Sequence, residues 1–277
     1  MLKGYHCRGA CCILNSYRGS AIVKFCVLAS GSSGNAALVA TEKTRILVDA
    51  GLSVKELTRR LALAGEEPER LTAVLVTHEH CDHVAGLARL LRRFPIPVYV
   101  THRTGPAIDW GETVPRLERF QAGARLSVGD IDVDSFTIPH DAADPVGFCF
   151  RAEGIKIGVA TDLGYVTESI RFHLRGTHVL LLESNHDLDM LKVGPYPWSV
   201  KQRVMSRMGH LSNAGMSDFL LSDWAPSAPN IVLGHLSEQN NHPEIVRLVA
   251  SQALERRALD ARLVVASQRQ PTESFQF

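Results

Sequence analysis

The chain carries the sequence His-Glu-His-Cys-Asp-His at residues 78–83, directly after an apolar stretch with the composition of a β-strand. Side chains at alternate positions of an extended segment share a face, so His78 and His80 can point at one metal ion. Asp82 and His83 lie past the turn and can reach a second ion beside the first. A lone histidine on an apolar face usually packs or hydrogen-bonds, but four ligand-type residues at this spacing indicate a site for divalent metal ions.

Further residues of the same chemical types stand where later apolar stretches end. They are His140, Asp162 and His235. The ends of strands are where α/β proteins build their sites, so we expect these residues to meet the histidine cluster. The predicted ligands are His78, His80 and His140 for one ion and Asp82, His83 and His235 for the other, with Asp162 bridging the two. Such ligands suit zinc, and manganese or iron would also be accommodated.

The composition is that of an ordinary globular protein, with 45% hydrophobic and 21% charged residues among 277. A formal net charge of +1 neither demands nor excludes a nucleic-acid partner. No apolar run approaches the roughly 20 residues that span a bilayer, and we find no secretory signal, so we expect a cytoplasmic protein. The cysteines have no Cys-x-x-Cys spacing, which argues against a zinc ribbon, and Cys81 is expected to be a small packed residue.

The order of apolar and polar segments predicts one α/β domain over residues 23–277. Residues 1–22 match nothing that follows. We expect them to be a disordered extension, or the result of a misassigned start, with Val23 as the true first residue. Residues 129–130 and 153–154 are expected to be hairpin turns. We predict strands at 23–28, 36–40, 45–48, 72–77, 98–101, 124–128, 131–138, 147–152, 156–160, 179–182, 231–233 and 262–265, and helices at 53–64, 84–93, 103–118, 199–209, 214–223 and 243–257.

The ordered set of ligand-type residues closely resembles the motifs of the metallo-β-lactamase fold superfamily of binuclear hydrolases. The matching order is Asp49, His78-x-His80-x-Asp82-His83, His140, Asp162 and His235, and the resemblance covers residues 23–265. It implies a four-layer αβ/βα sandwich of two mixed β-sheets flanked by helices. It also implies that Asp49 fixes a ligand imidazole through its ring N–H, whereas the residue alone would also suit a turn or a helix cap.

Four shorter segments resemble the YycJ/WalJ-like branch of that superfamily. They are residues 29–35, 161–165, 183–187 and 209–213. This resemblance implies a metal-dependent phosphodiesterase, to which a 5′ to 3′ exodeoxyribonuclease activity has been attributed. The arrangement of His210 before His235 is also similar to that of ribonuclease Z-type nucleases.

The chemistry of the residues agrees with hydrolysis. Two neighbouring ions can share a water and lower its pKa from about 15.7 towards 7, so that a bridging hydroxide is the expected nucleophile. Asp82 can orient that water or accept its proton. His210 could protonate a leaving alkoxide, with a capping-turn histidine as the alternative. His186 either acts with His210 or braces Glu183 and Asp187.

We also predict residues that bind substrate in the small-residue turn at 30–35 and at the start of a helix. These are Ser30, Ser32, Asn35 and Asn213. The turn exposes backbone N–H groups and hydroxyls that could cradle a phosphate, and a plain tight turn between the two strands is the nearly equal alternative.

The leading hypothesis is a binuclear phosphodiesterase that acts on nucleic acid and trims DNA ends. One alternative is the hydrolysis of a thioester or lactam. A di-iron redox enzyme is disfavoured because His80 stands where that branch carries glutamate. A non-catalytic binding protein is disfavoured because converging buried polar ligands cost stability without metal.

Overall fold

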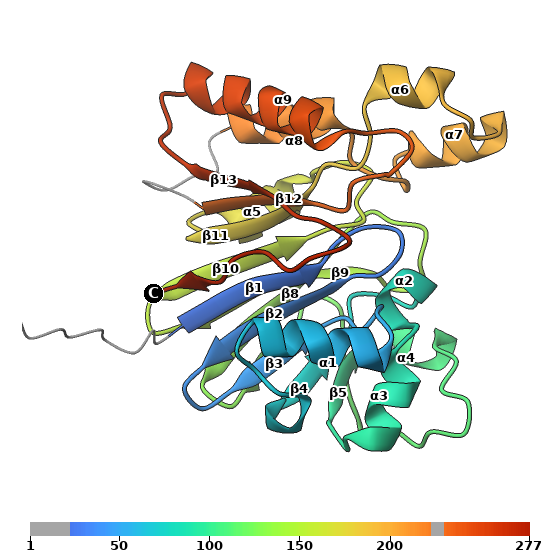
Figure 1. Ribbon diagram of the computed structural model, residues 1–277, viewed down its shortest axis with the longest axis vertical. Coiled ribbons are helices and arrows are strands. Elements are labelled where there is room, and N and C mark those ends of the chain that lie inside the picture. Colours follow the sequence, from blue (N-terminus) through green and yellow to red (C-terminus); the bar gives the residue numbers. More distant parts are fainter. Residues whose placement is uncertain (1–22, 223–229) are drawn as a thin grey trace, which may run out of the picture.

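The computed structural model describes residues 23–222 and 230–277. The expected extension at residues 1–22 lies outside these ranges, and the single domain from 23 to 277 stays a prediction. Within the described residues the chain forms two seven-stranded sheets that face each other, with helices on both outer sides (Figure 1). No helix in this part of the chain is long and apolar enough to cross a membrane.

The first sheet contains the N-terminal strands and a short C-terminal one. Its order is β14-β1-β2-β3-β4-β5-β6, with antiparallel pairing from β14 to β3 and parallel pairing from β3 to β6. The strands are β1 (Val23–Ala29), β2 (Ala36–Thr41), β3 (Arg45–Val48), β4 (Ala73–Leu75), β5 (Val98–Thr101), β6 (Leu117–Phe120) and β14 (Phe275–Gln276).

The second sheet has the order β13-β12-β11-β10-β9-β8-β7. Its pairing is antiparallel from β7 to β10, where the predicted turns at 129–130 and 153–154 join neighbouring strands, and parallel from β10 to β13. The strands are β7 (Arg125–Val128), β8 (Ile131–Thr137), β9 (Val146–Ala152), β10 (Ile155–Ala160), β11 (Val179–Glu183), β12 (Asn230–Gly234) and β13 (Arg262–Val265).

The helices cover the outer faces of the two sheets (Figure 1). Those on the side of the first sheet are α1 (Val54–Leu63), α2 (Cys81–Val84), α3 (Leu87–Arg93) and α4 (Thr104–Ala107), with a 3-10 turn at Pro68–Arg70. Those on the side of the second sheet are α5 (Glu168–Leu174), α6 (Leu188–Val193), α7 (Trp198–Val204), α8 (Asn213–Leu221) and α9 (Pro243–Arg256). The longer helices begin at side-chain caps, as at Ser53, whose hydroxyl accepts from the Glu56 amide.

Apolar side chains fill the space between the sheets and the space under each helical layer. In β1, Phe25 and Val27 pack between the sheets while Cys26 and Leu28 face the helices, as the two-residue period of a strand requires. Phe148 contributes to the core between the sheets from the second sheet. The predicted four-layer fold class is therefore confirmed.

Several local predictions differ from the structure. The helix expected at 103–118 is limited to α4, because Gly111 and Pro115 disfavour its continuation, and its last residues belong to strand β6 instead. No strand was predicted after residue 265, but this segment contains β14, which pairs with β1. The helix expected from Val84 is divided at Gly86, where a Cβ atom would lie 1.8 Å from the Leu52 carbonyl oxygen.

Candidate metal centre

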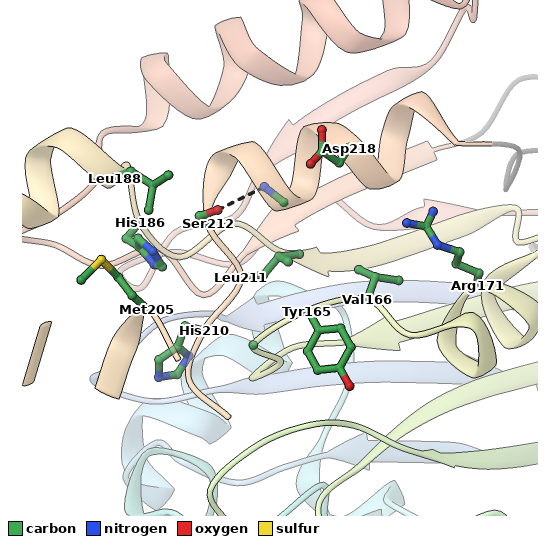
Figure 2. Close-up of a pocket in the computed structure, with 12 residues that line it drawn as sticks. Tyr165, Val166, Arg171, His186, Leu188, Met205, His210, Leu211, Ser212 and Asp218 are labelled. Atoms are coloured by element: carbon green, nitrogen blue, oxygen red, sulfur yellow. Dashed lines mark hydrogen bonds between the residues drawn. The ribbon is translucent and has the colours of Figure 1, made fainter. Parts of the chain in front are cut away.

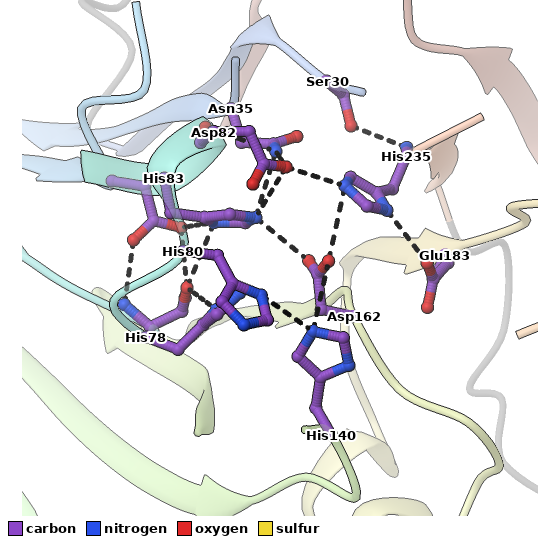
Figure 3. A network of polar contacts seen from close by, with 12 residues as sticks. Ser30, Asn35, His78, His80, Asp82, His83, His140, Asp162, Glu183 and His235 are labelled. Atoms are coloured by element: carbon purple, nitrogen blue, oxygen red, sulfur yellow. Dashed lines mark hydrogen bonds and ion pairs between the residues drawn. The ribbon is translucent and has the colours of Figure 1, made fainter. Parts of the chain in front are cut away.

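The predicted ligands come from separate strands and meet at one edge of the sheets (Figure 3). They follow β4, β8, β10 and β12, and two of them belong to the short helix α2. Potential ligand atoms lie within 4.8 Å of one another in a group of His78, His80 and His140 and in a group of Asp82, His83, Asp162 and His235. The structure thus brings together all the side chains that the sequence predicted as ligands.

The first group consists of imidazoles. The ring centroid of His78 lies 4.7 Å from that of His80 and 5.1 Å from that of His140. The Nε2 atom of His140 lies 3.3 Å from Nδ1 of His80. The Nε2 atom of His78 is buried and has no hydrogen-bond partner among the described residues. Converging imidazole nitrogens with a buried unpartnered atom among them fit a bound cation.

The second group pairs imidazoles with carboxylates. The Nε2 atom of His235 lies 3.3 Å from an oxygen of Asp82 and 3.3 Å from one of Asp162. The Nε2 atom of His83 lies 3.3 Å from the other Asp162 oxygen. Asp162 also approaches the first group, with 4.0 Å between its Oδ1 and Nε2 of His140. Its position between the groups is the one that a bridging ligand requires.

The charges in the second group are already balanced without metal. Burial acts to raise the pKa of Asp162, but the neighbouring imidazoles of His235 and His83 hold it well below the usual value. Burial acts to lower the pKa of His235, but Asp162, Asp82 and Glu183 raise it to about 10. Protons on the imidazoles therefore supply positive charge that a divalent ion can replace, which is how metal binding couples to proton release. The donor set fits divalent metal ions.

Hydrogen bonds to the far ring nitrogens orient three of the imidazoles. Nδ1 of His83 lies 2.8 Å from Asp49 Oδ2, and Nδ1 of His140 lies 3.1 Å from the Gly209 carbonyl oxygen. Nδ1 of His235 lies 2.9 Å from Glu183 Oε1. When each Nδ1 donates its proton in this way, each Nε2 is left as an acceptor directed at the cluster. Asp49 occupies the orienting position that the family resemblance implied.

Glu183 is the functional residue that the sequence analysis did not assign. It lies at the end of β11 and is fully buried. Besides His235, its Oε1 contacts Nδ1 of His210 at 2.8 Å, and its Oε2 accepts from the backbone amides of Leu163 and Leu211 at 2.8 and 3.2 Å. Burial would raise its pKa, but the neighbouring His210 and His235 lower it to about 2. A charged residue ending an apolar strand was the signal available in the sequence.

His210 lies at the border of the cluster. Its ring centroid is 5.1 Å from that of His140 and 5.2 Å from that of His235, and its side chain is 22% exposed. Burial acts to lower its pKa, but the Glu183 carboxylate raises it above the usual value. The Glu183 carboxylate thus favours the protonated form of the His210 imidazole.

His186 is buried near His210 and has an unusual environment (Figure 2). Neither ring nitrogen has a hydrogen-bond partner among the described residues. Burial lowers its pKa to about 4, so its imidazole is neutral. The interpretation that His186 braces Glu183 and Asp187 is wrong, because Glu183 uses its oxygens elsewhere and Asp187 caps α6.

The residues predicted to bind substrate are mostly engaged within the protein. The Ser30 hydroxyl accepts from the His235 amide at 2.8 Å, and the Asn35 amide nitrogen lies 3.0 Å from Asp82 Oδ2. Asn213 is buried and accepts from the Ser184 hydroxyl. These contacts do not fit substrate binding by these three side chains, whereas Ser32 is exposed. Their short polar side chains instead hold loops together, a role that residue type alone could not distinguish.

Cys81 was also expected to pack against the protein. It is exposed instead, because α2 begins at this residue and turns its side chain outward from the ligand cluster.

Comparison with known proteins identifies relatives over most of the chain. The family described as a β-lactamase superfamily domain matches residues 44–224. Exodeoxyribonuclease YycJ of Bacillus anthracis is 38% identical over 234 residues, which are 83% of this chain and 89% of that protein. Exodeoxyribonuclease WalJ of Streptococcus pneumoniae serotype 2 (strain D39 / NCTC 7466) is 36% identical over 230 residues, which are 81% of this chain and 86% of that protein.

Solved structures agree on the fold. The metallo-β-lactamase fold protein YhfI from Bacillus subtilis superposes with a TM-score of 0.71 at 16% identity, covering 91% of this chain and 99% of that one. The resemblance inferred from the sequence motifs is thereby confirmed. The chain belongs to the metallo-β-lactamase superfamily of metal-dependent hydrolases and, within it, to the same family as the YycJ and WalJ proteins.

Proposed function

We propose that this protein is a metal-dependent phosphodiesterase that cleaves nucleic acid, with DNA as the favoured substrate and removal from a 5′ end as the mode. The observation that carries the proposal is the buried Glu183–His210 pair beside the ligand cluster. The names of the relatives, which are exodeoxyribonucleases, support the choice of substrate. A cytoplasmic location belongs to the same proposal.

The ligand groups would hold two divalent ions, for which zinc or manganese is the best candidate and iron is also compatible. The imidazoles of His78, His80 and His140 would hold one ion. The residues Asp82, His83 and His235 would hold the other, with Asp162 shared. When bound, the ions supply a water of lowered pKa and polarise a phosphoryl oxygen.

The side chains of the protein account for the proton transfers. In the proposed reaction the water oxygen forms a bond to phosphorus, and the bond between phosphorus and the sugar oxygen breaks. Asp82, whose side chain is 18% exposed, orients the water and takes its proton. His210, as an imidazolium, gives its Nε2 proton to the departing sugar oxygen, and Glu183 accepts a hydrogen bond from Nδ1 and so holds the ring in place.

The need for this proton favours a phosphodiester over a thioester. A sugar alkoxide is a strong base and departs poorly unless it is protonated, whereas a thiolate departs without a proton. A buried carboxylate that raises the pKa of His210 above its usual value is therefore useful for the first substrate and unnecessary for the second. Thioester hydrolysis remains the second candidate only because the superfamily fold itself does not select a substrate.

The experiment that tests this proposal is an assay of metal-reconstituted protein. We expect cleavage of 5′-labelled and 3′-labelled DNA. Comparison of single-stranded and double-stranded DNA and RNA then defines the preferred substrate. We expect His210→Ala to retain metal and to lose about 10²–10⁴-fold in kcat on DNA. Its activity on bis-p-nitrophenyl phosphate, whose p-nitrophenolate departs without a proton, is expected to fall much less.

His102→Ala is the matched control, because His102 is exposed and outside the cluster. Turnover of a thioester without cleavage of any phosphodiester would refute the proposed function.

A further inference from the structure

A pocket of about 230 Å³ opens beside the metal centre, on the side of the second sheet (Figure 2). His210 belongs both to this pocket and to a group of potential ligand atoms that includes Asp162 and His235. The pocket therefore begins at the side chain that, in the proposed function, protonates the departing oxygen. The group attached to that oxygen would therefore lie next to this pocket.

The walls of the pocket combine apolar side chains with the polar side chains of Arg171, Ser212 and Asp218. The apolar side chains include Tyr165, Val166, Leu188, Met205 and Leu211, which come from the loop after β10, the start of α6 and the segments before and after His210. Such a mixed surface suits a nucleoside, whose base is apolar on its faces and polar at its edge and whose sugar is polar. The volume lies below the range of about 300–1,000 Å³ that is usual for ligand pockets, so it suits a single nucleoside.

His186 provides a further polar group in this surface. The residue is 1% exposed, lines the pocket, and has two ring nitrogens without hydrogen-bond partners among the described residues. Leaving a buried polar group unsatisfied costs about 1–3 kcal/mol, which indicates a partner absent from the protein itself. A neutral imidazole offers one donor and one acceptor, and the edges of nucleobases offer the same pair of groups.

The backbone around His186 holds the ring in place. The Asn213 amide donates to the His186 carbonyl oxygen at 2.9 Å, and the residue forms a bridge with Ser212, the cap of α8. The next amide, that of Asp187, donates to the Asn240 carbonyl oxygen at 2.9 Å. The imidazole is thus positioned by fixed backbone rather than by contacts of its own ring.

We propose that this pocket receives the nucleoside that carries the departing oxygen, and that His186 determines specificity by hydrogen bonding to its base. This inference rests on the proposed function and deepens it. With cleavage from a 5′ end, the pocket holds the terminal nucleoside, whose 3′ oxygen accepts the proton from His210. A pocket that holds one nucleoside also accounts for removal of one nucleotide at a time.

The first experiment compares DNA strands that end in thymidine, in deoxyadenosine or in an abasic tetrahydrofuran residue. For the wild-type protein we expect kcat/KM to be at least about 10-fold lower on the abasic end, in line with the effect of one lost polar contact. His186→Leu should remove this discrimination, and His186→Gln, which keeps a donor and an acceptor, should restore part of it.

The second experiment fills the pocket. Leu188→Trp is expected to lower the ratio of kcat/KM on DNA to that on bis-p-nitrophenyl phosphate at least about 10-fold. Val193→Trp is the matched control, because Val193 is on the same helix, is 86% exposed and does not line the pocket.

The third experiment needs neither metal nor turnover. Thymidine added to the metal-free protein is expected to shift the ring-proton NMR signals of His186 in a saturable way, and His186→Leu is expected to abolish binding. Equal cleavage of natural and abasic ends by an active wild-type protein would overturn the pocket assignment while the proposed function stands. Absence of any DNA cleavage would refute the proposed function, and the thymidine titration would then decide for or against the pocket separately.

Discussion

Replacing Glu183 with glutamine tests whether this buried carboxylate controls both a metal ligand and the proton donor. The two side chains have the same shape, but glutamine has one oxygen and one amide nitrogen where Glu183 has two acceptors. One carboxylate oxygen accepts from His210 and His235, and the other accepts from the amides of Leu163 and Leu211. Glutamine can satisfy only one of these pairs.

Either orientation of the new side chain has a defined cost. If the oxygen faces the two backbone amides, the amide nitrogen faces His235 and His210, whose Nδ1 atoms must then become acceptors. The proton of His235 then moves to Nε2, the atom that faces Asp82 and Asp162, and metal affinity should fall about 10–100-fold. If the oxygen faces the imidazoles, two buried N–H groups lose their partners at about 1–3 kcal/mol each in stability.

The rate effect should depend on the leaving group. The Glu183 charge raises the pKa of His210, so removing this charge should lower that pKa. A smaller fraction of the imidazole is then protonated at neutral pH and able to act as a general acid. We expect kcat on DNA at saturating metal to fall about 10²–10⁴-fold. The kcat on bis-p-nitrophenyl phosphate should fall much less, because its leaving group needs no proton.

The assay therefore combines metal titration, urea unfolding and kinetics on both substrates. Glu56→Gln, on the outer face of α1, is the matched control and should leave metal affinity unchanged. An equal fall on both substrates at saturating metal would refute the proton-transfer argument. Unchanged metal affinity together with unchanged stability would refute the argument from hydrogen bonding.

Three further predictions concern the metal and the buried histidines. Asp49→Asn should weaken metal binding about 10–100-fold, measured by competition with a chromophoric chelator, because asparagine cannot hold Nδ1 of His83 as a carboxylate does. Removal of metal should lower the melting temperature, since ions at 100 times their Kd stabilise the folded state by about 2.7 kcal/mol; a melting temperature independent of metal concentration would contradict the site. Because burial lowers the pKa of His186 from 6.5 to about 4, the unfolded chain takes up the proton first as the pH falls. Between these two pH values the metal-free protein should lose about 3 kcal/mol more in stability than His186→Leu does, as measured by urea unfolding.

The ligand cluster could be predicted because each member combines a ligand-type side chain with the end of an apolar strand. His140 and His235 are separated by many residues, yet both follow strands of the second sheet that end at the same edge. Strand ends and residue types are visible in the sequence, so their convergence follows from the fold class. Their roles as metal ligands stay predictions until the metal content is measured.

Hydrogen-bond partners could not be predicted in the same way. Glu183 stands at a strand end like the ligands, but only the structure shows that its oxygens face His210, His235 and two backbone amides. Asn213 has the residue type of a substrate ligand, but its side chain is used inside the protein. Such roles depend on which donor lies opposite each atom, and that is set by packing between segments distant in the sequence.

The direction of the ligand side chains depends on backbone geometry that residue type does not reveal. Asp49, Asp162 and His235 have φ angles of 60°, 60° and 55°, in the left-handed region that residues other than glycine seldom adopt. Each stands just past the end of a strand, β3, β10 or β12. Asp162 and His235 turn their side chains into the cluster (Figure 3), and Asp49 contacts the His83 ring. Strain of this kind costs about 1–3 kcal/mol per residue and persists only where surrounding structure enforces it.

The enforcing contacts are backbone hydrogen bonds between the two sides of the site. The amide of Ala50 donates to the His83 carbonyl oxygen at 2.8 Å, and the amide of Asn35 donates to the Asp82 carbonyl oxygen at 2.7 Å. Gly51 permits this approach, since a Cβ atom there would lie 1.7 Å from the Asp82 oxygen. The segment after β3 and the helix that carries two predicted ligands are therefore fixed against each other. Because these contacts join backbone groups and do not depend on the ligand side chains, they position the cluster for binding a metal ion.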